Sequence, residues 1–217
     1  MTQTSTVSRL PAILIGLAAL VLASLLAARM LGDRDAVAKV GGGTSVSPSG
    51  ADAAEWGAFP EFELVSQERQ TVTRDDLLGT PFVACAVFTN CTGPCPGITG
   101  QMQELQEVFQ DLDVKLVSIT VDPLNDTPER FGEYAASYDA DPERWLFLTG
   151  SEKAVDALVS AGFFLSVDRG GREITHDKRL VAVDAKGRRR GWYDGTDPEA
   201  IVRLKSRMRA LAAEASL

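Results

Sequence analysis

Two cysteines, Cys91 and Cys95, are the residues of this chain with the clearest capacity for chemistry. They lie four positions apart in the segment Phe88-Thr-Asn-Cys-Thr-Gly-Pro-Cys-Pro96. Two thiolates at this spacing can bind a soft metal ion such as Cu(I), and two neighbouring thiols can exchange electrons with a disulfide. The structural alternative is an inert disulfide, or a pair of buried thiols with no role in chemistry.

The surrounding sequence predicts the environment of Cys95. Pro81–Thr89 is an almost continuous apolar run, which predicts a strand buried on both faces. Apolar residues at spacings of three and four predict a helix from about Pro96 to Leu112. Cys95 would then lie in or beside the first helical turn, where unpaired N–H groups and the helix dipole favour a thiolate. We therefore expect the pKa of Cys95 to lie below the value of about 8.5 for an ordinary cysteine.

The third cysteine and the single histidine have different expected roles. Cys85 lies within the apolar run, which predicts a small, inert core residue. His176 is the only histidine, so multi-histidine metal sites and Cys₂His₂ zinc fingers are excluded. A lone histidine is most often a surface or capping residue. Together with two thiolates, however, one imidazole would make a chemically sensible copper site.

The composition is that of a globular protein with an acidic balance. The chain has 217 residues, is 45% hydrophobic and 24% charged, and carries a net charge of −8 from 22 basic and 30 acidic residues. These values exclude wholesale disorder and fibrous classes. The negative charge argues against a nucleic-acid partner, because such proteins normally carry a basic patch.

The N-terminal part of the chain predicts a membrane anchor. Leu10–Ala28 is an uncharged run of 19 residues, long enough to cross about 30 Å of hydrocarbon as a helix. It exceeds the apolar core of about 7–15 residues found in a cleaved signal peptide, so we favour an uncleaved anchor. Basic residues on both sides leave its orientation ambiguous. The expected organisation is a tail at 1–9, a single transmembrane anchor at 10–32, a flexible linker at 33–55 and a soluble domain at 56–217.

The domain alternates strand and helix patterns, which predicts an α/β sandwich around a mixed sheet, most compactly a thioredoxin-like fold. The other strands are expected at Phe62–Val65, Gln70–Val72, Val114–Val121, Trp145–Leu148, Arg179–Asp184 and Arg189–Tyr193, with a turn or helix at Thr73–Leu78. Further helices are expected at the Thr127-Pro128-Glu129 start, at Ser151–Ala161 and after Asp197.

Several pieces of sequence occur in a characteristic order: Phe88-Thr-x-Cys91-x-x-x-Cys95-Pro96, Val117-Ser-Ile-Thr-Val-Asp122-Pro123, Asp126-Thr-Pro-Glu-Arg130, Tyr134-Ala135, Trp145–Gly150, and Thr175-His176 before Leu180–Asp184. Together they resemble the Sco/SenC family of copper-binding, thioredoxin-like proteins involved in cytochrome c oxidase assembly. The resemblance covers most of residues 59–213. Two positions differ from the expected family pattern: Gly93 stands where many members carry Asp, and Asn90 where a larger or more basic residue is common.

The resemblance implies one copper ion per domain, as Cu(I) or Cu(II), with Cys91, Cys95 and His176 as ligands. It implies an inner-membrane protein whose domain faces the periplasm, and a partner that is the copper-bearing subunit of cytochrome c oxidase or another copper chaperone. A metallochaperone is therefore the leading interpretation. The alternative is a thiol:disulfide oxidoreductase that uses Cys91 and Cys95 as a redox pair, able to form a disulfide, and keeps a partner's copper-site cysteines reduced. A peroxiredoxin is a distant third.

Overall fold

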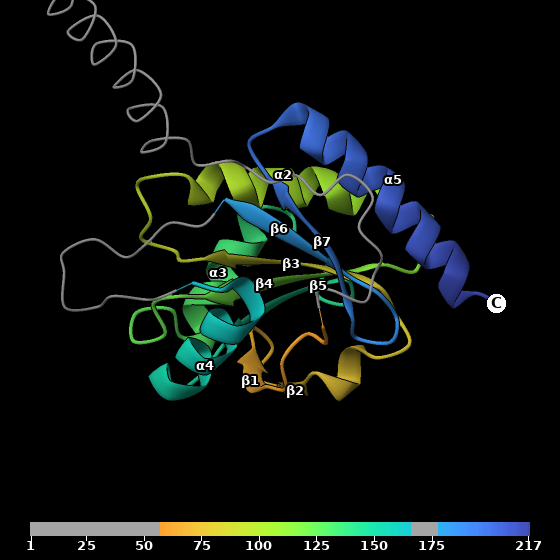
Figure 1. Ribbon diagram of the computed structural model, residues 1–217. Helices are drawn as coiled ribbons and strands as arrows, with labels where there is room; N and C mark the ends of the chain where they lie inside the picture. Colours follow the sequence, from red (N-terminus) through yellow and green to blue (C-terminus); the bar gives the residue numbers. More distant parts are fainter. Residues whose placement is uncertain (1–56, 166–177) are drawn as a thin grey trace, which may run out of the picture. The chain divides into compact units, whose positions relative to one another are not determined.

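The computed structural model describes residues 57–165 and 178–217, which all belong to one compact unit, Ala51–Leu217. The unit is built on a seven-stranded sheet in the order β2-β1-β5-β4-β3-β6-β7 (Figure 1). The strands are β1 (Glu63–Ser66), β2 (Thr71–Thr73), β3 (Phe82–Val87), β4 (Lys115–Thr120), β5 (Trp145–Thr149), β6 (Arg179–Val183) and β7 (Arg189–Asp194).

The sheet is mixed, as the sequence predicts. β3, β4 and β5 run parallel to one another, whereas β6 pairs antiparallel with β3 and with β7. On the other side, β1 pairs antiparallel with both β5 and β2. The parallel strands place the chain segments that follow β3 and β4 at the same edge of the sheet.

Helices cover both faces of the sheet, and α2 and α4 lie on opposite sides in Figure 1. α2 is linked to α3 by a hydrogen bond between the Thr99 and Tyr134 hydroxyls (2.9 Å), and to α5 by an ion pair between Glu104 and Lys205. On the other face, Phe59 packs edge-on against Phe82 and against Phe163 of α4. The helices are α2 (Cys95–Val108), α3 (Pro128–Ala136), α4 (Glu152–Phe163) and α5 (Pro198–Ala215), with a short 3₁₀ turn at Asp75–Leu77.

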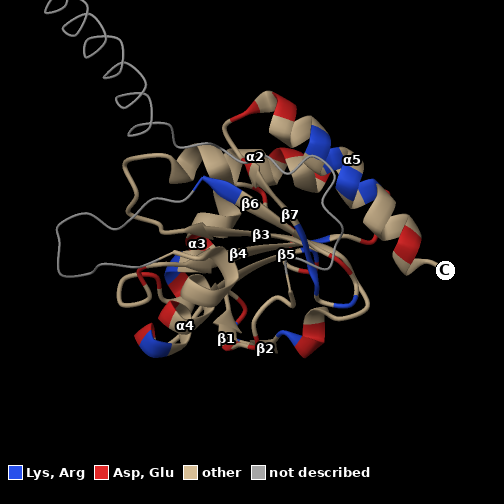
Figure 2. Ribbon diagram, viewed as in Figure 1, with Lys and Arg blue, Asp and Glu red and all other residues tan. Residues whose placement is uncertain are grey.

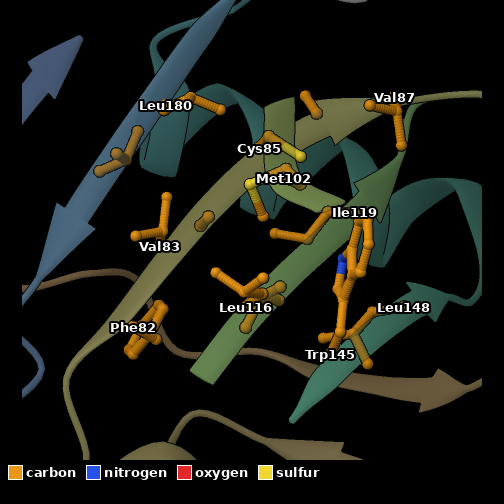
Figure 3. Packing of buried hydrophobic residues seen from close by; sticks show 14 of the residues in the cluster. Phe82, Val83, Cys85, Val87, Met102, Leu116, Ile119, Trp145, Leu148 and Leu180 are labelled. Atoms are coloured by element: carbon orange, nitrogen blue, oxygen red, sulfur yellow. The ribbon is translucent and has the colours of Figure 1, made fainter. Parts of the chain in front are cut away.

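The core is centred on β3, whose six residues are all buried. Cys85 is fully buried, so the prediction of a core position for this residue is confirmed. Its Sγ lies 3.4 Å from the Ser118 Oγ, which also accepts a hydrogen bond from the Trp145 indole N–H at 3.0 Å. Figure 3 shows Cys85, Met102 and Trp145 among these packed side chains.

α2 ends one turn earlier than the periodicity predicts. The helix stops at Val108, whereas the apolar pattern continues to Leu112. The guanidinium of Arg144 donates hydrogen bonds to the carbonyl groups of Phe109, Gln110 and Leu112, at 2.6 to 2.8 Å. These carbonyls are satisfied by a distant side chain, so the chain can leave the helix without losing hydrogen bonds.

No helix among the described residues is both long and apolar enough to span a membrane. The predicted anchor at 10–32 and the linker at 33–55 lie outside the described residues. Both remain predictions from the sequence.

The buried Ser118 hydroxyl gives a first test of the core. Ser118→Ala would leave the fully buried Trp145 N–H without its acceptor and should lower the free energy of unfolding by about 1–3 kcal/mol. Urea unfolding measures the change. In a double-mutant cycle with Trp145→Phe, which removes the N–H group, the cost of Ser118→Ala should fall by at least about half. An equal cost in both backgrounds would contradict this account.

Candidate metal-binding and thiol-redox site

The two cysteines predicted to carry the chemistry lie where β3 passes into α2. After β3 the chain makes a tight turn, in which the Cys91 N–H donates a hydrogen bond to the Phe88 carbonyl oxygen at 3.3 Å. Cys95 is the first residue of α2, and Pro96 follows it in the first turn. Proline is favoured there because its missing N–H would have no helical partner. The predicted strand-to-helix placement of the pair is confirmed.

The structure brings the two thiols into direct contact. The Cys91 and Cys95 side chains are hydrogen-bonded to each other, and neither forms a disulfide. Cys91 is 8% exposed and Cys95 is 2% exposed. A ligand or a partner thiol would therefore meet Cys91 first.

The prediction of an acidic Cys95 thiol is wrong. Burial raises the pKa of Cys95 well above its ordinary value, and the hydrogen bond with Cys91 raises it further. A backbone hydrogen bond from Phe88 acts in the opposite direction and does not compensate. Desolvation disfavours the thiolate more than the start of the helix favours it.

Few formal charges lie near the two cysteines in the sequence. Residues 77–103 contain no charged side chain, and Figure 2 shows the start of α2 free of acidic and basic colouring. Residues 57–165 together carry a net charge of −12, whereas residues 178–217 carry +5. Both cysteines therefore lie in a neutral stretch within an acidic part of the chain, and no cation close in the sequence offsets the desolvation of the Cys95 thiolate.

Contacts from the start of α3 hold the turn before Cys91. The Asp126 carboxylate accepts hydrogen bonds from the Thr89 hydroxyl (2.6 Å) and from the Thr89 N–H (3.2 Å). The Arg130 guanidinium donates a hydrogen bond to the Asn90 side-chain oxygen. Asn90, which differs from the expected family pattern, therefore has a hydrogen-bond partner in α3. From the sequence, Asp126–Arg130 indicates the start of a helix and forms part of the family resemblance, but nothing in it predicts a contact with the turn before Cys91.

The remaining predicted ligand, His176, lies outside the described residues. Within residues 57–165 and 178–217, no group of three or more His, Cys, Asp or Glu side chains is placed to hold a metal ion. The described part of the chain thus supplies two sulfur donors, which suit a soft ion. The assignment of His176 as a third ligand remains a prediction.

A thioredoxin-like α/β domain with a thiol pair between a buried strand and a helix defines the class of this protein. The family model of SCO1/SenC matches residues 52–210, and the chain belongs to this family. A relative named SCO1 protein homolog, from Bacillus subtilis (strain 168), is 31% identical over 141 residues, which are 63% of this chain and 73% of the relative.

Solved structures of the family share the fold. BsSco, described as a member of the Sco family of cytochrome c oxidase assembly proteins with a disulfide switch, has a TM-score of 0.65 at 27% identity and covers 72% of this chain and 94% of its own. A SCO1/SenC family lipoprotein from Bacillus anthracis has a TM-score of 0.67 at 28% identity. The match covers 73% of this chain and 96% of the lipoprotein chain. Bradyrhizobium japonicum ScoI, solved with copper bound, has a TM-score of 0.57 at 23% identity. The match covers 69% of this chain and 98% of the ScoI chain.

Thiol reactivity tests the electrostatics of the site. In the reduced, metal-free protein, alkylation of Cys95 by iodoacetamide should titrate at a pH above the ordinary midpoint of about 8.5, because burial disfavours its thiolate. Cys85 should stay unmodified while the protein is folded. Peptide mass spectrometry across a pH series measures both, with urea-unfolded protein as the control. Rapid modification of Cys95 at pH 7 in the folded protein would overturn this account.

Proposed function

We propose that this protein is a membrane-anchored metallochaperone that binds one copper ion through Cys91, Cys95 and His176. It delivers the ion to the copper-bearing subunit of cytochrome c oxidase, directly or through another copper chaperone. The observation that carries the proposal is the contact between two reduced, nearly buried thiols at the start of α2. Membership of the SCO1/SenC family supports the same assignment.

The donor set suits copper as a cargo. Two sulfur ligands satisfy Cu(I), which accepts low coordination numbers and soft donors. An imidazole nitrogen from His176 would help to hold Cu(II). Binding displaces the thiol protons, so the ion replaces the hydrogen bond that links Cys91 and Cys95 in the metal-free protein.

A second candidate function uses the same pair as a reductant. Cys91, the more exposed thiol, would attack a partner's disulfide as the thiolate and form a mixed disulfide, releasing one partner thiol. Cys95 would then displace the second partner thiol and close the Cys91–Cys95 disulfide. Two electrons and two protons pass to the partner. The contact between the two thiols and the greater exposure of Cys91 favour keeping this alternative.

Copper titration of the chain tests the ligand set. His176→Ala should weaken Cu(I) binding only in part and should largely abolish the sulfur-to-Cu(II) charge-transfer absorption. Cys91→Ser or Cys95→Ser should abolish binding of both ions, because a hydroxyl is a poor ligand for a soft metal. Cys85→Ser is the matched control, since this residue lies in the core, and it should bind one copper ion normally once folded.

A cellular experiment separates the two functions. Under copper limitation, cells carrying His176→Ala should assemble less active cytochrome c oxidase if the protein delivers copper. A reductase would work without the imidazole. Full oxidase activity with His176→Ala, together with loss of activity with Cys91→Ser, would therefore reject the chaperone and retain the reductase.

The proposed location of the site is the periplasmic side of the inner membrane. The support is the uncharged run Leu10–Ala28 and a thiol and copper site whose client lies outside the cytoplasm. A reporter that is active only outside the cytoplasm, fused after Leu217, should give a signal. Activity of a cytoplasm-specific reporter at the same position would reject both the location and the role in oxidase assembly.

A further inference from the structure

We infer that Asp126 is a positioning residue for the thiol pair: its buried carboxylate anchors the turn that carries Cys91. The metal-binding part of this inference rests on the function proposed above. Its redox part rests only on the contact between Cys91 and Cys95.

The first step is the geometry of the turn. Phe88 and Cys91 are its first and last residues, joined by the hydrogen bond from the Cys91 N–H to the Phe88 carbonyl. Phe88 also contributes the backbone hydrogen bond to the Cys95 thiol. One turn therefore contacts both cysteines, and any movement of this turn changes their relative position.

Both central residues of the turn are held from outside. Asp126 binds the N–H and the hydroxyl of Thr89, and Arg130 binds the side-chain oxygen of Asn90. These partners are 37 and 40 residues away in the sequence, so the contacts are tertiary. The turn is fixed by α3 and the residues before it rather than by its own sequence alone.

The carboxylate of Asp126 is costly to bury, which argues that it is not a passive core residue. Asp126 is 0% exposed, and burial raises its pKa. Its hydrogen-bond partners are the hydroxyls of Thr89 and Thr120, both at 2.6 Å, and the Thr89 N–H. No Lys or Arg among the described residues pairs with it, so hydrogen bonds alone compensate for the lost hydration.

Thr120 links the Asp126 carboxylate to the end of β4 through a hydrogen bond. Thr120 is the last residue of β4, and its hydroxyl donates to one Asp126 oxygen while accepting a hydrogen bond from the Asp122 N–H at 2.8 Å. The other Asp126 oxygen accepts a hydrogen bond from the Thr89 hydroxyl. Asp126 thus links the end of β4 to the turn that follows the neighbouring strand β3.

α3 also contacts the helix that carries Cys95. The Tyr134 hydroxyl lies 2.9 Å from that of Thr99, which stands one helical turn after Cys95. The segment from Asp126 to Tyr134 therefore contacts the chain on both sides of the pair. It sets the separation of the sulfur atoms before a metal ion or a disulfide forms, which lowers the entropy cost of either event.

The test compares variants on the two sides of the carboxylate. Thr89→Val removes the hydroxyl that faces the turn, and Thr120→Val removes the hydroxyl that faces the sheet. Asp126→Ala removes all these contacts, and Asp126→Asn keeps an oxygen acceptor for Thr89. Each variant is first checked for folding by circular dichroism and urea unfolding, and only conditions under which it is folded are used.

Two readouts follow in the full chain. One is the equilibrium constant for forming the Cys91–Cys95 disulfide in glutathione buffers, and the other is Cu(I) affinity measured by competition with a chromophoric chelator. Asp126→Ala should lower both the disulfide equilibrium constant and the Cu(I) affinity by about tenfold or more, as expected for the loss of a hydrogen bond to a charged group. Thr89→Val should change them in the same direction by a smaller factor, and Asp126→Asn should restore most of the loss. Thr120→Val should lower stability but change both readouts less than about twofold.

The outcomes distinguish this inference from the proposed function. Failure of the unmodified protein to bind copper would reject the proposed function and leave the glutathione measurement as the test of Asp126. Folded Asp126→Ala and Thr89→Val proteins with unchanged disulfide equilibrium and unchanged copper affinity would overturn the inference. Equal effects of Thr89→Val and Thr120→Val would also overturn it, because they would indicate a general loss of stability.

Discussion

The pairing of β3 with β4 and β6 positions the thiol site. β3 is hydrogen-bonded on both edges, and all its side chains are buried, so a shift of its register would expose core residues and break two ladders together. Its parallel register with β4 pairs Val87 with Thr120, the last residue of each strand. The turn carrying Cys91 and the segment carrying Asp126 therefore leave the sheet at the same edge. The contact between Thr89 and Asp126 follows directly from this register.

Desolvation, rather than the helix dipole, controls the charge of the site. Cys95 lies at a helix start, which favours an anion, yet burial and the neighbouring thiol keep it protonated. No charged residue lies between positions 77 and 103 to offset this effect. Cys95 therefore stays a neutral thiol that is hydrogen-bonded to Cys91. A reactive thiolate at Cys95 would require a more polar environment than its buried position at the start of α2 provides.

Local sequence patterns predicted most of the fold, because burial and helix capping leave periodic signals. The buried strand β3, the start of α2 near Cys95 and the N-cap at Thr127 are all evident from a few neighbouring residues. The predictions fail where residues distant in the sequence determine the local structure or the local electrostatics. The end of α2 depends on Arg144, about 35 residues away, and the pKa of Cys95 depends on how deeply packing buries it. The role of Asp126 depends on a contact with Thr89 across 37 residues, for which one sequence has no local signal.

Burial of the site also explains why metal binding and redox chemistry suit the same pair. Two thiols and a disulfide are both uncharged, and a complex of two thiolates would carry −1 with Cu(I) and no charge with Cu(II). A free dithiolate would carry −2, which is the state that desolvation disfavours most. The buried site therefore favours the dithiol, the disulfide and the copper complexes over the free dithiolate, which carries more charge than any of them. Electrostatics at the pair cannot choose between the two functions, so the choice depends on a third ligand and on the partner that reaches Cys91.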